Sequence, residues 1–115
     1  MRRKREIKFA KGRKWSYYEA FFLRRALAKD IASGVEHFRT MTRYAMAPGE
    51  LTEEEWDQVL KDIVWFFTEA AQGYPGIYRA GSYEGEEYKK QRAAYEARME
   101  RGKEAFVKYF DTLWD

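Results

Sequence analysis

Hydrophobic positions recur at helical spacing in three stretches of the chain, with polar residues between them. In the first stretch they advance in steps of three and four, which is the spacing of one helical face. Ser16 and Glu19 can form a capping box at its start, and Pro48 disfavours helical geometry in the residue before it. The pattern predicts one helix over about residues 16–46, and Gly34 is a possible point of breakage within it. Its stripe is Ala20, Leu23, Leu27, Ile31, Val35, Phe38, Thr42 and Ala45.

The second stretch has the clearest local start signal in the chain. Thr52 and Glu55 can form another capping box, with Leu51 placed to contact Trp56 across it. Gly73 suits the residue that follows the end of a helix. We therefore expect a helix over about residues 53–72. Its apolar stripe is Trp56, Val59, Leu60, Ile63, Phe67 and Ala70.

The third stretch has a 3.5-residue period, which is typical of helices that pack against a partner helix. It predicts a helix over about residues 83–114, with Gly102 in phase at a point where a neighbouring helix can approach closely. The positions on this face are Tyr88, Arg92, Tyr95, Met99, Gly102, Phe106, Tyr109 and Leu113.

Helices joined by short connections are usually antiparallel neighbours. The expected fold is therefore all-α, an up-down-up bundle of three long helices that forms a single domain over residues 15–115. The side chains expected in its core are Ala20, Leu27, Ile31, Phe38, Val59, Ile63, Phe67, Met99, Phe106 and Leu113.

One end of the predicted bundle has more aromatic side chains than a three-helix core needs. It combines the start of the first helix, the end of the second and the Gly- and Tyr-rich segment 73–82, which we expect to be an irregular loop. One interpretation is a lid in which Tyr74, Ile77, Tyr78 and Tyr83 cover this end. The other is a protein-binding surface, for which this composition is typical, or a homodimer that buries Phe22 and Trp65. The candidate protein-binding residues are Tyr74, Tyr78, Arg79, Tyr83, Phe22 and Trp65.

Charge separates a basic N-terminal arm, residues 1–14, from an acidic body. The arm carries eight Lys and Arg against Glu6, a net charge of +7, whereas the other 101 residues carry 14 Lys and Arg against 18 Asp and Glu, a net charge of −4. Such an arm suits phosphate groups, with aromatic rings for stacking, although it can also be only a solubilising tail. The candidate residues for binding nucleic acid or an acidic partner are Arg2, Arg3, Lys4, Arg5, Lys8, Lys11, Arg13, Lys14 and Trp15.

Catalytic and metal chemistry have little support in the residues. The absence of cysteine excludes disulfides, thiolate metal sites and cysteine nucleophiles, and it favours a cytoplasmic location. The single histidine, His37, has no second ligand at metal-binding spacing, and no glycine-rich phosphate-binding motif is present. No apolar run is long enough to span a membrane. We expect a soluble protein without catalytic residues, metal or cofactor.

These observations predict a small non-catalytic binding protein. The first hypothesis is a nucleic-acid-associated accessory or regulatory factor that uses the basic arm and the aromatic end. The alternative is a protein-binding adaptor or inhibitor, such as a phage or mobile-element regulator, that engages a larger protein through the same surface. Salt distinguishes the two, because phosphate binding weakens steeply as the salt concentration rises, whereas an aromatic protein interface is affected much less.

Overall fold

The computed structural model describes residues 12, 14–41, 47–49, 51–80 and 84–113, with the backbone alone at 78–80. These residues form five α-helices and one short 3-10 helix, and they include no strand. The all-α class is therefore confirmed. The elements are α1 (Tyr17–Phe21), α2 (Leu23–Met41), α3 (Glu53–Ala71), α4 (Pro75–Ala80), α5 (Gly85–Tyr109) and the 3-10 helix η2 (Phe110–Thr112).

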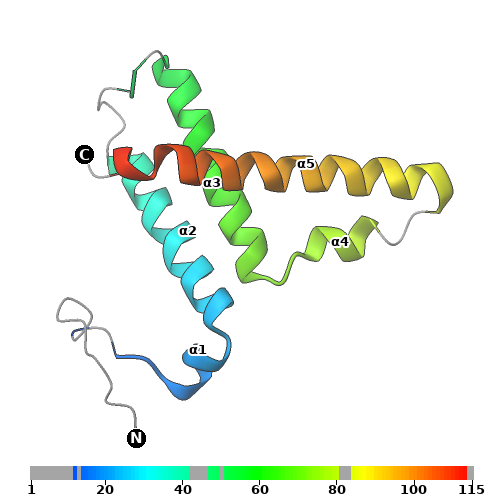
Figure 1. Ribbon diagram of the computed structural model, residues 1–115, viewed down its shortest axis with the longest axis horizontal. Helices are drawn as coiled ribbons and strands as arrows, with labels where there is room; N and C mark the ends of the chain where they lie inside the picture. Colours follow the sequence, from blue (N-terminus) through cyan, green and yellow to red (C-terminus); the bar gives the residue numbers. More distant parts are fainter. Residues whose placement is uncertain (1–11, 13, 42–46, 50, 81–83, 114–115) are drawn as a thin grey trace, which may run out of the picture.

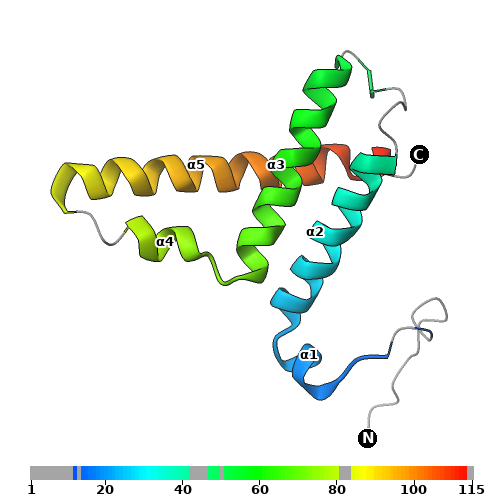
Figure 2. The ribbon, with the colours of Figure 1, turned by 180° about the vertical axis from the view of Figure 1, so that it is seen from behind.

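The helices do not lie as the predicted up-down-up bundle requires. Figures 1 and 2 show α2 and α3 side by side and running in opposite directions, whereas α5 lies across α3 instead of alongside it. The C-terminal end of α5 reaches the C-terminal end of α2. Its N-terminal half extends beyond α3, with α4 beside it. The fold is thus a helical hairpin crossed by a third long helix.

The crossing of α5 and α3 is made at Gly102. This glycine is buried, and a Cβ atom added to it would lie 2.6 Å from the Cβ of Phe66 and 2.7 Å from the backbone oxygen of Asp62. The backbone of α5 therefore rests directly on α3 at this point. The expectation that an in-phase glycine allows close helix approach is confirmed.

The hydrophobic core surrounds α3. Its most buried side chain is Ile63, which is 0% exposed and clusters with Val35, Trp56 and Leu60. From α2, the small side chains Ala28 and Ala32 are buried together with Val35. From the C-terminal part of α5, two aromatic rings complete the core: Phe106 packs against Phe67 with ring centroids 4.8 Å apart, and Tyr109 packs against Trp56 at 5.5 Å.

The predicted stripes agree with the observed burial for two of the three long helices. No residue of the α3 stripe is exposed, and all eight positions on the predicted face of α5 are buried or half-buried. For the first stripe the agreement begins only at Ile31 of α2, because Ala20 of α1 and Leu23 and Leu27 of α2 are exposed. The predicted core positions Ala20 and Leu27 are therefore wrong. The cause is the end of α3 at Ala71, which leaves the earlier part of the stripe without a neighbour.

The helix expected over residues 16–46 is interrupted at Phe22 rather than at Gly34. Phe22 has φ −106° and ψ 47°, which separates α1 from α2, and α2 continues through Gly34 to Met41. Residues 42–46 lie outside the described residues. Helices in proteins depend mainly on tertiary packing, and aromatic residues have modest helix propensity. Beyond the end of α3 there is no core against which a continuous helix would pack, so the break occurs there.

The segment expected to be an irregular loop contains α4, so that expectation is wrong. Gly73, with φ 80°, ends α3, and the Tyr74 amide donates to the Glu69 carbonyl oxygen at 2.8 Å. This is the hydrogen bond of a Schellman motif, a common helix C-terminus. Pro75 then occupies the first position of α4, where its missing amide hydrogen costs nothing and its fixed φ favours a helix.

The crossing at Gly102 predicts opposite effects for two glycine substitutions. Gly102→Ala places a methyl group against Phe66 and the Asp62 carbonyl, and we expect a loss of about 1–3 kcal/mol in the free energy of unfolding. Gly34→Ala, in an exposed part of α2 with no neighbouring atom within 4 Å of the added carbon, should stabilise the protein by about 0.5–1 kcal/mol. Urea denaturation of both variants measures this, and a stabilising Gly102→Ala would contradict the crossing.

The position of the core predicts a second contrast. Ile63→Ala removes a fully buried side chain and should lower the free energy of unfolding by about 2–5 kcal/mol. Leu27→Ala should cost about 0.5 kcal/mol or less, because the side chain is 42% exposed. Thermal and urea denaturation of the two variants provide the test. Equal losses would show that Leu27 packs into the core as the sequence pattern first suggested.

Candidate binding surface at the start of α2

The segment from Trp15 to the second turn of α2 exposes a group of large apolar side chains. Their exposed fractions range from 39% at Phe22 to 85% at Tyr17. We call this group the aromatic surface. Its members are Trp15, Tyr17, Tyr18, Phe21, Phe22, Leu23 and Leu27.

The rings of the aromatic surface pack on one another. Tyr18 and Phe22 have ring centroids 4.7 Å apart, Phe21 and Phe22 meet edge to face at 5.0 Å, and Tyr17 stacks on Phe21 at 6.2 Å. Two of these pairs are four residues apart, which is the spacing of neighbours along a helix. The cluster is therefore organised by local sequence, without a hydrophobic core beneath it.

A capping box fixes the start of α1. The Ser16 amide donates to Glu19 Oε1 at 3.1 Å, and the Glu19 amide donates to Ser16 Oγ at 3.0 Å. Both partners of the predicted box are present. Because these two bonds satisfy amides at the N-terminus of α1, they hold the short helix and its rings in place.

Between α1, α2 and the end of α3 lies a partly open hollow of about 450 Å³. We call it the α1–α3 hollow. Its apolar lining consists of Tyr18, Phe22, Ala26 and Ala71, and its charged lining consists of Glu19, Arg25, Lys29 and Asp30.

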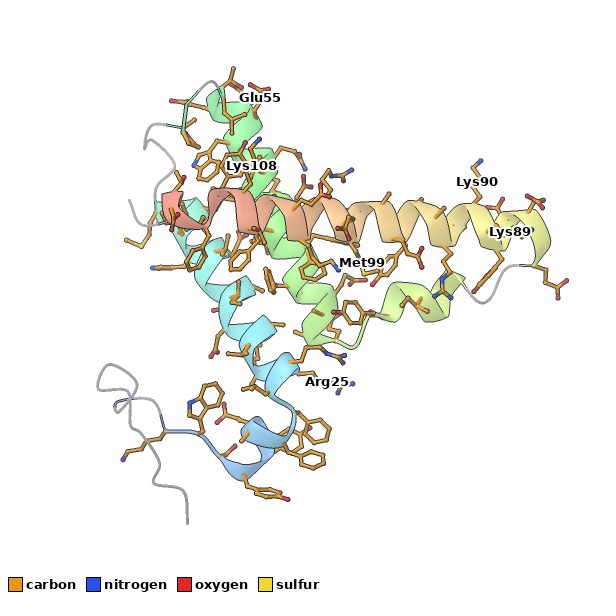
Figure 3. The ribbon with its side chains drawn as sticks, in the orientation of Figure 1. Arg25, Glu55, Lys89, Lys90, Met99 and Lys108 are labelled. Atoms are coloured by element: carbon orange, nitrogen blue, oxygen red, sulfur yellow. The ribbon has the colours of Figure 1, made fainter. Side chains whose placement is uncertain are left out.

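Arg25 extends toward the C-terminus of α3 (Figure 3). A Cβ atom added to Gly73 would lie 2.9 Å from the Nη2 of this arginine, so the guanidinium group lies directly beside the helix end. A cation is favoured there by the negative end of the helix dipole. Beside it, the Arg24 guanidinium lies 5.3 Å from the centre of the Tyr74 ring, which attaches the start of α2 to the chain that follows α3.

The structure places the predicted protein-binding residues in different surroundings. Phe22 belongs to the aromatic surface, whereas Trp65 is half-buried, with its ring 5.4 Å from that of Tyr95 and the guanidinium of Arg98 4.0 Å from its centre. Trp65 therefore has partners within the chain, and its ring does not need a second copy of the protein to cover it. The homodimer interpretation assumed an up-down-up bundle, whereas the transverse course of α5 brings Tyr95 and Arg98 to this ring.

The predicted lid is described only in part. Tyr74 is half-buried, with its ring 6.4 Å from that of Phe66. Tyr78 and Arg79 lie in α4, but their side chains are outside the described part of the structure, as is Tyr83. From Tyr74 the chain continues into α4, which lies beside α5 and away from α1 (Figures 1 and 2). The described part of the segment does not cover the aromatic surface.

Of the predicted arm residues, Lys14 and Trp15 are described, and both are exposed immediately before α1. The others lie outside the described residues: Arg2, Arg3, Lys4, Arg5, Lys8, Lys11 and Arg13. Their predicted roles in binding therefore stay predictions.

Sequence reasoning did not name most members of the aromatic surface as site residues. The sequence did contain a pattern that indicates exposed rings. On a helix, the side chains of Tyr17, Tyr18, Phe21 and Phe22 point in nearly every direction. In a small bundle of three helices, each helix usually turns only one apolar face toward the others. That pattern alone indicates exposed rings, but it does not show which of them remain uncovered.

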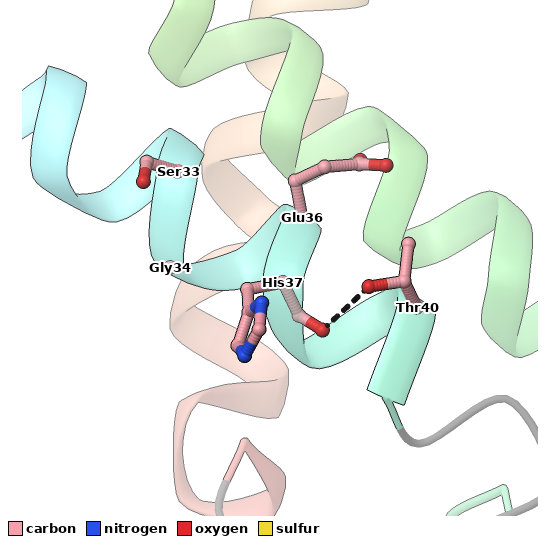
Figure 4. Close-up of a pocket in the computed structure, with 5 residues that line it drawn as sticks. All are labelled: Ser33, Gly34, Glu36, His37 and Thr40. Carbon is pink, nitrogen blue, oxygen red and sulfur yellow. Dashed lines mark hydrogen bonds between the residues drawn. The ribbon is translucent and has the colours of Figure 1, made fainter.

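A second, shallower hollow lies on α2 and offers little chemistry. It is lined by Ser33, Gly34, Glu36, His37 and Thr40, all from one helix (Figure 4). The Thr40 hydroxyl donates to the His37 carbonyl oxygen at 2.9 Å, and Glu36 binds Arg39. Among the described residues, no other element lines this hollow, so they bring no second chemical group to His37 there.

Two buried carboxylates lie where α3 meets α5, and both are hydrogen-bonded. Asp62 accepts from Gln58 at 3.0 Å and from Arg101 at 3.2 Å. Glu69 accepts from the hydroxyl of Tyr95 at 2.9 Å. These contacts satisfy charges that would otherwise be costly to bury, so the carboxylates hold the crossing together. Across the described residues, no three histidine or acidic side chains are grouped to hold a metal ion.

A surface ion-pair network joins α2 to α3. The Arg39 guanidinium binds Glu36 at 2.7 Å and Asp57 at 2.9 Å, and Lys61 lies 3.2 Å from Asp57. Hydrogen bonds from Arg39 lower the pKa of the Glu36 and Asp57 carboxyl groups. Ion pairing with Arg39, within α2 for Glu36 and between α2 and α3 for Asp57, accounts for these shifts, and structural ion pairs of this kind need no catalytic role.

Comparison with known proteins adds no relative. No family model, no curated protein and no solved structure matches the chain. None of the described helices combines the length and the apolar composition needed to cross a bilayer.

The Arg39 network predicts a pH-dependent contribution to stability. Because the folded-state pKa values of Glu36 and Asp57 are lowered, the contribution is present above the unfolded-state values and lost as the pH falls through the folded ones. Arg39→Gln should therefore lower the free energy of unfolding by about 0.5–1 kcal/mol near neutral pH, a modest figure because the pairs are partly exposed. Urea denaturation against pH should show the difference shrinking in acid, as the pH falls through the lowered pKa values of the two carboxyl groups and they become protonated.

The matched control is Lys89→Gln, which removes a pair between two exposed side chains on α5. We expect no measurable change in stability at either pH. A loss in Arg39→Gln that is equally large in acid and at neutral pH would contradict the electrostatic explanation.

Proposed function

We propose that the protein is a small non-catalytic binding protein that docks on a larger protein through the aromatic surface. The observation that carries this proposal is the group of seven apolar side chains, each at least 39% exposed, at one end of the α2–α3 hairpin. Exposed apolar surface of this kind is typical of interaction sites. Aromatic side chains dominate such interfaces because they give large contact areas.

The leucines of the surface favour a protein partner over a nucleic acid. Aromatic rings stack on bases, but Leu23 and Leu27 offer only aliphatic area, and they are 45% and 42% exposed. A hydrophobic pocket or helix face on another protein uses both kinds of side chain. This favours the adaptor or inhibitor hypothesis, of which a phage or mobile-element regulator is one example.

Nucleic-acid association through the basic arm is the second candidate function. The net charge of +7 over residues 1–14 supports it, and the arm leads directly into the aromatic surface through Lys14 and Trp15. Such binding would be directed to phosphates and weakly sequence-specific. A cytoplasmic location, expected from the absence of cysteine, likewise stays a prediction.

The first function predicts that the aromatic surface determines partner binding. Tagged wild-type protein and the Phe21→Ser/Leu27→Ser variant are used to capture partners from a nuclease-treated extract of the native host. The partner is identified by mass spectrometry, purified and titrated by calorimetry. We expect the variant to bind about tenfold more weakly or worse, since truncating central apolar anchors commonly costs more than about 1 kcal/mol.

The matched control is Val107→Ser, which makes the same kind of change on α5 at a side chain that is 78% exposed. It should bind the partner as the wild type does. Melting curves confirm that all three proteins are folded. If both variants bind the purified partner with wild-type affinity, the proposed function is wrong.

The second function predicts that the arm binds nucleic acid. Deletion of residues 1–14 should abolish binding to single-stranded and duplex oligonucleotides measured by fluorescence anisotropy at low salt. For the full chain, affinity should fall by about tenfold or more between about 50 mM and about 200 mM salt, as release of several counterions requires. Undiminished binding after the deletion excludes this function.

A further inference from the structure

We propose that the α1–α3 hollow receives an acidic amphipathic segment of the partner protein. An apolar side chain of that segment occupies the aromatic lining, and its carboxylates pair with Arg25 and Lys29. This inference rests on the proposed protein-binding function and adds the chemical class of the partner.

The first support is that two cations in the lining, Arg25 and Lys29, lack an ion-pair partner among the described residues. Arg25 and Lys29 are four residues apart on α2, so they lie on the same side of the helix, and both line the hollow. Neither forms an ion pair with any residue that the structure describes, whereas Arg39, Lys61 and Arg101 all do. Two neighbouring cations without a carboxylate between them repel each other, and an acidic ligand removes that repulsion.

The acidic residues of the hollow do not take this role. The Glu19 carboxylate accepts the Ser16 amide hydrogen in the capping box of α1. Asp30 follows Lys29 directly, and it too has an interaction elsewhere in the chain. Neither carboxylate forms an ion pair with Arg25 or Lys29 that the structure describes, so these two cations can still contact a ligand, while Glu19 and Asp30 keep their own negative charge in the lining.

The second support is the distribution of charge along the chain. Residues 1–30 contain 11 Lys and Arg and 3 Asp and Glu, a net charge of +8, while residues 31–115 have a net charge of −5. Seven of the eight residues that line the hollow belong to this positive part of the sequence. Complementary charge accelerates association and excludes partners of the same sign, so this end of the molecule selects an acidic partner.

The third support is the size and lining of the hollow. Its volume of about 450 Å³ is enough for one or two side chains, and Tyr18, Phe22, Ala26 and Ala71 provide apolar walls. Helical segments that bind in apolar grooves use anchors three or four residues apart. A segment with Leu, Phe or Trp at that spacing can pack these side chains against the apolar walls. Asp or Glu between them can form ion pairs with Arg25 and Lys29.

The test uses the full chain and three fluorescent synthetic peptides of about 16 residues, long enough for several helical turns. The first has Leu and Trp on one helical face and Glu and Asp on the other. The second has Lys in place of the acids, and the third has Ser in place of the apolar residues. By anisotropy, we expect the first peptide to bind about tenfold more tightly than either control.

Variants of the protein then locate the site. Arg25→Glu/Lys29→Glu should reverse the preference, so that the Lys peptide binds more tightly than the acidic one. Lys29→Glu alone gives a smaller change in the same direction and leaves the Arg25 contact with α3 in place. The matched control is Lys89→Glu/Lys90→Glu on the distant part of α5 (Figure 3), which should leave both affinities unchanged.

Several results overturn the inference. Equal binding of the acidic apolar peptide and the Ser peptide would show attraction to the arm alone. An unchanged preference in the folded Arg25→Glu/Lys29→Glu and Lys29→Glu variants would exclude these cations. Displacement of the peptide by a tighter-binding oligonucleotide that requires Arg25 and Lys29 would identify a nucleic acid as the occupant. A dimer in sedimentation that is lost in the same variants would identify a second copy.

The purified partner separates this inference from the proposed function. If Phe21→Ser/Leu27→Ser weakens partner binding but Arg25→Glu/Lys29→Glu does not, the aromatic surface binds the partner and the acidic-segment inference is wrong. If neither variant weakens it, both are wrong. If both weaken it and the peptides behave as expected, both are supported.

Discussion

The contact between Gly102 and α3 is the constraint on which the arrangement of the helices depends. Only a residue without a side chain allows the backbone of α5 to approach Phe66 and the Asp62 carbonyl this closely. On either side of this point, Arg101 binds Asp62 and Phe106 packs on Phe67. The crossing is thus held by a backbone contact, an ion pair between exposed Arg101 and buried Asp62, and an aromatic pair, which together determine where α5 lies on α3.

The transverse course of α5 also explains the exposed surface on α2. A third helix alongside the hairpin would have covered the stripe from Leu23 to Phe38 along its whole length. Instead, the end of α5 lies near the end of α2 (Figure 1), and the earlier part of the stripe is left without a covering helix. Leu23 and Leu27 are consequently exposed beside the rings of α1. The exposure of Leu23 and Leu27 therefore follows from two features together, the end of α3 at Ala71 and the course of α5 across the hairpin.

The local features of this fold could be predicted from the sequence because they depend on neighbouring residues. Spacing and side-chain type predict both capping boxes and the bounds of α3 to within one residue. They also predict the inward face of α5 and the close approach of the helices at Gly102. The crossing of α5 could not be predicted, because periodicity shows which face of a helix is buried but not the angle at which a partner meets it. The Arg98 contact of Trp65 depends on that geometry, and the break at Phe22 depends on where the core ends beyond α3. The excess of aromatic residues was visible in the sequence, but which of them remained exposed was not.

The part of α5 beyond α3 gives the molecule two regions of unequal local stability. From Phe106 to Tyr109 the helix packs into the core, whereas near Tyr95 its support includes the ring of Trp65 and the buried Gly76 of α4. Opening α4 and the first turns of α5 therefore exposes little core surface and costs less free energy than unfolding the hairpin. Amide hydrogens in those turns should exchange with solvent through this partial opening, while those around Ile63 exchange only when the whole chain unfolds.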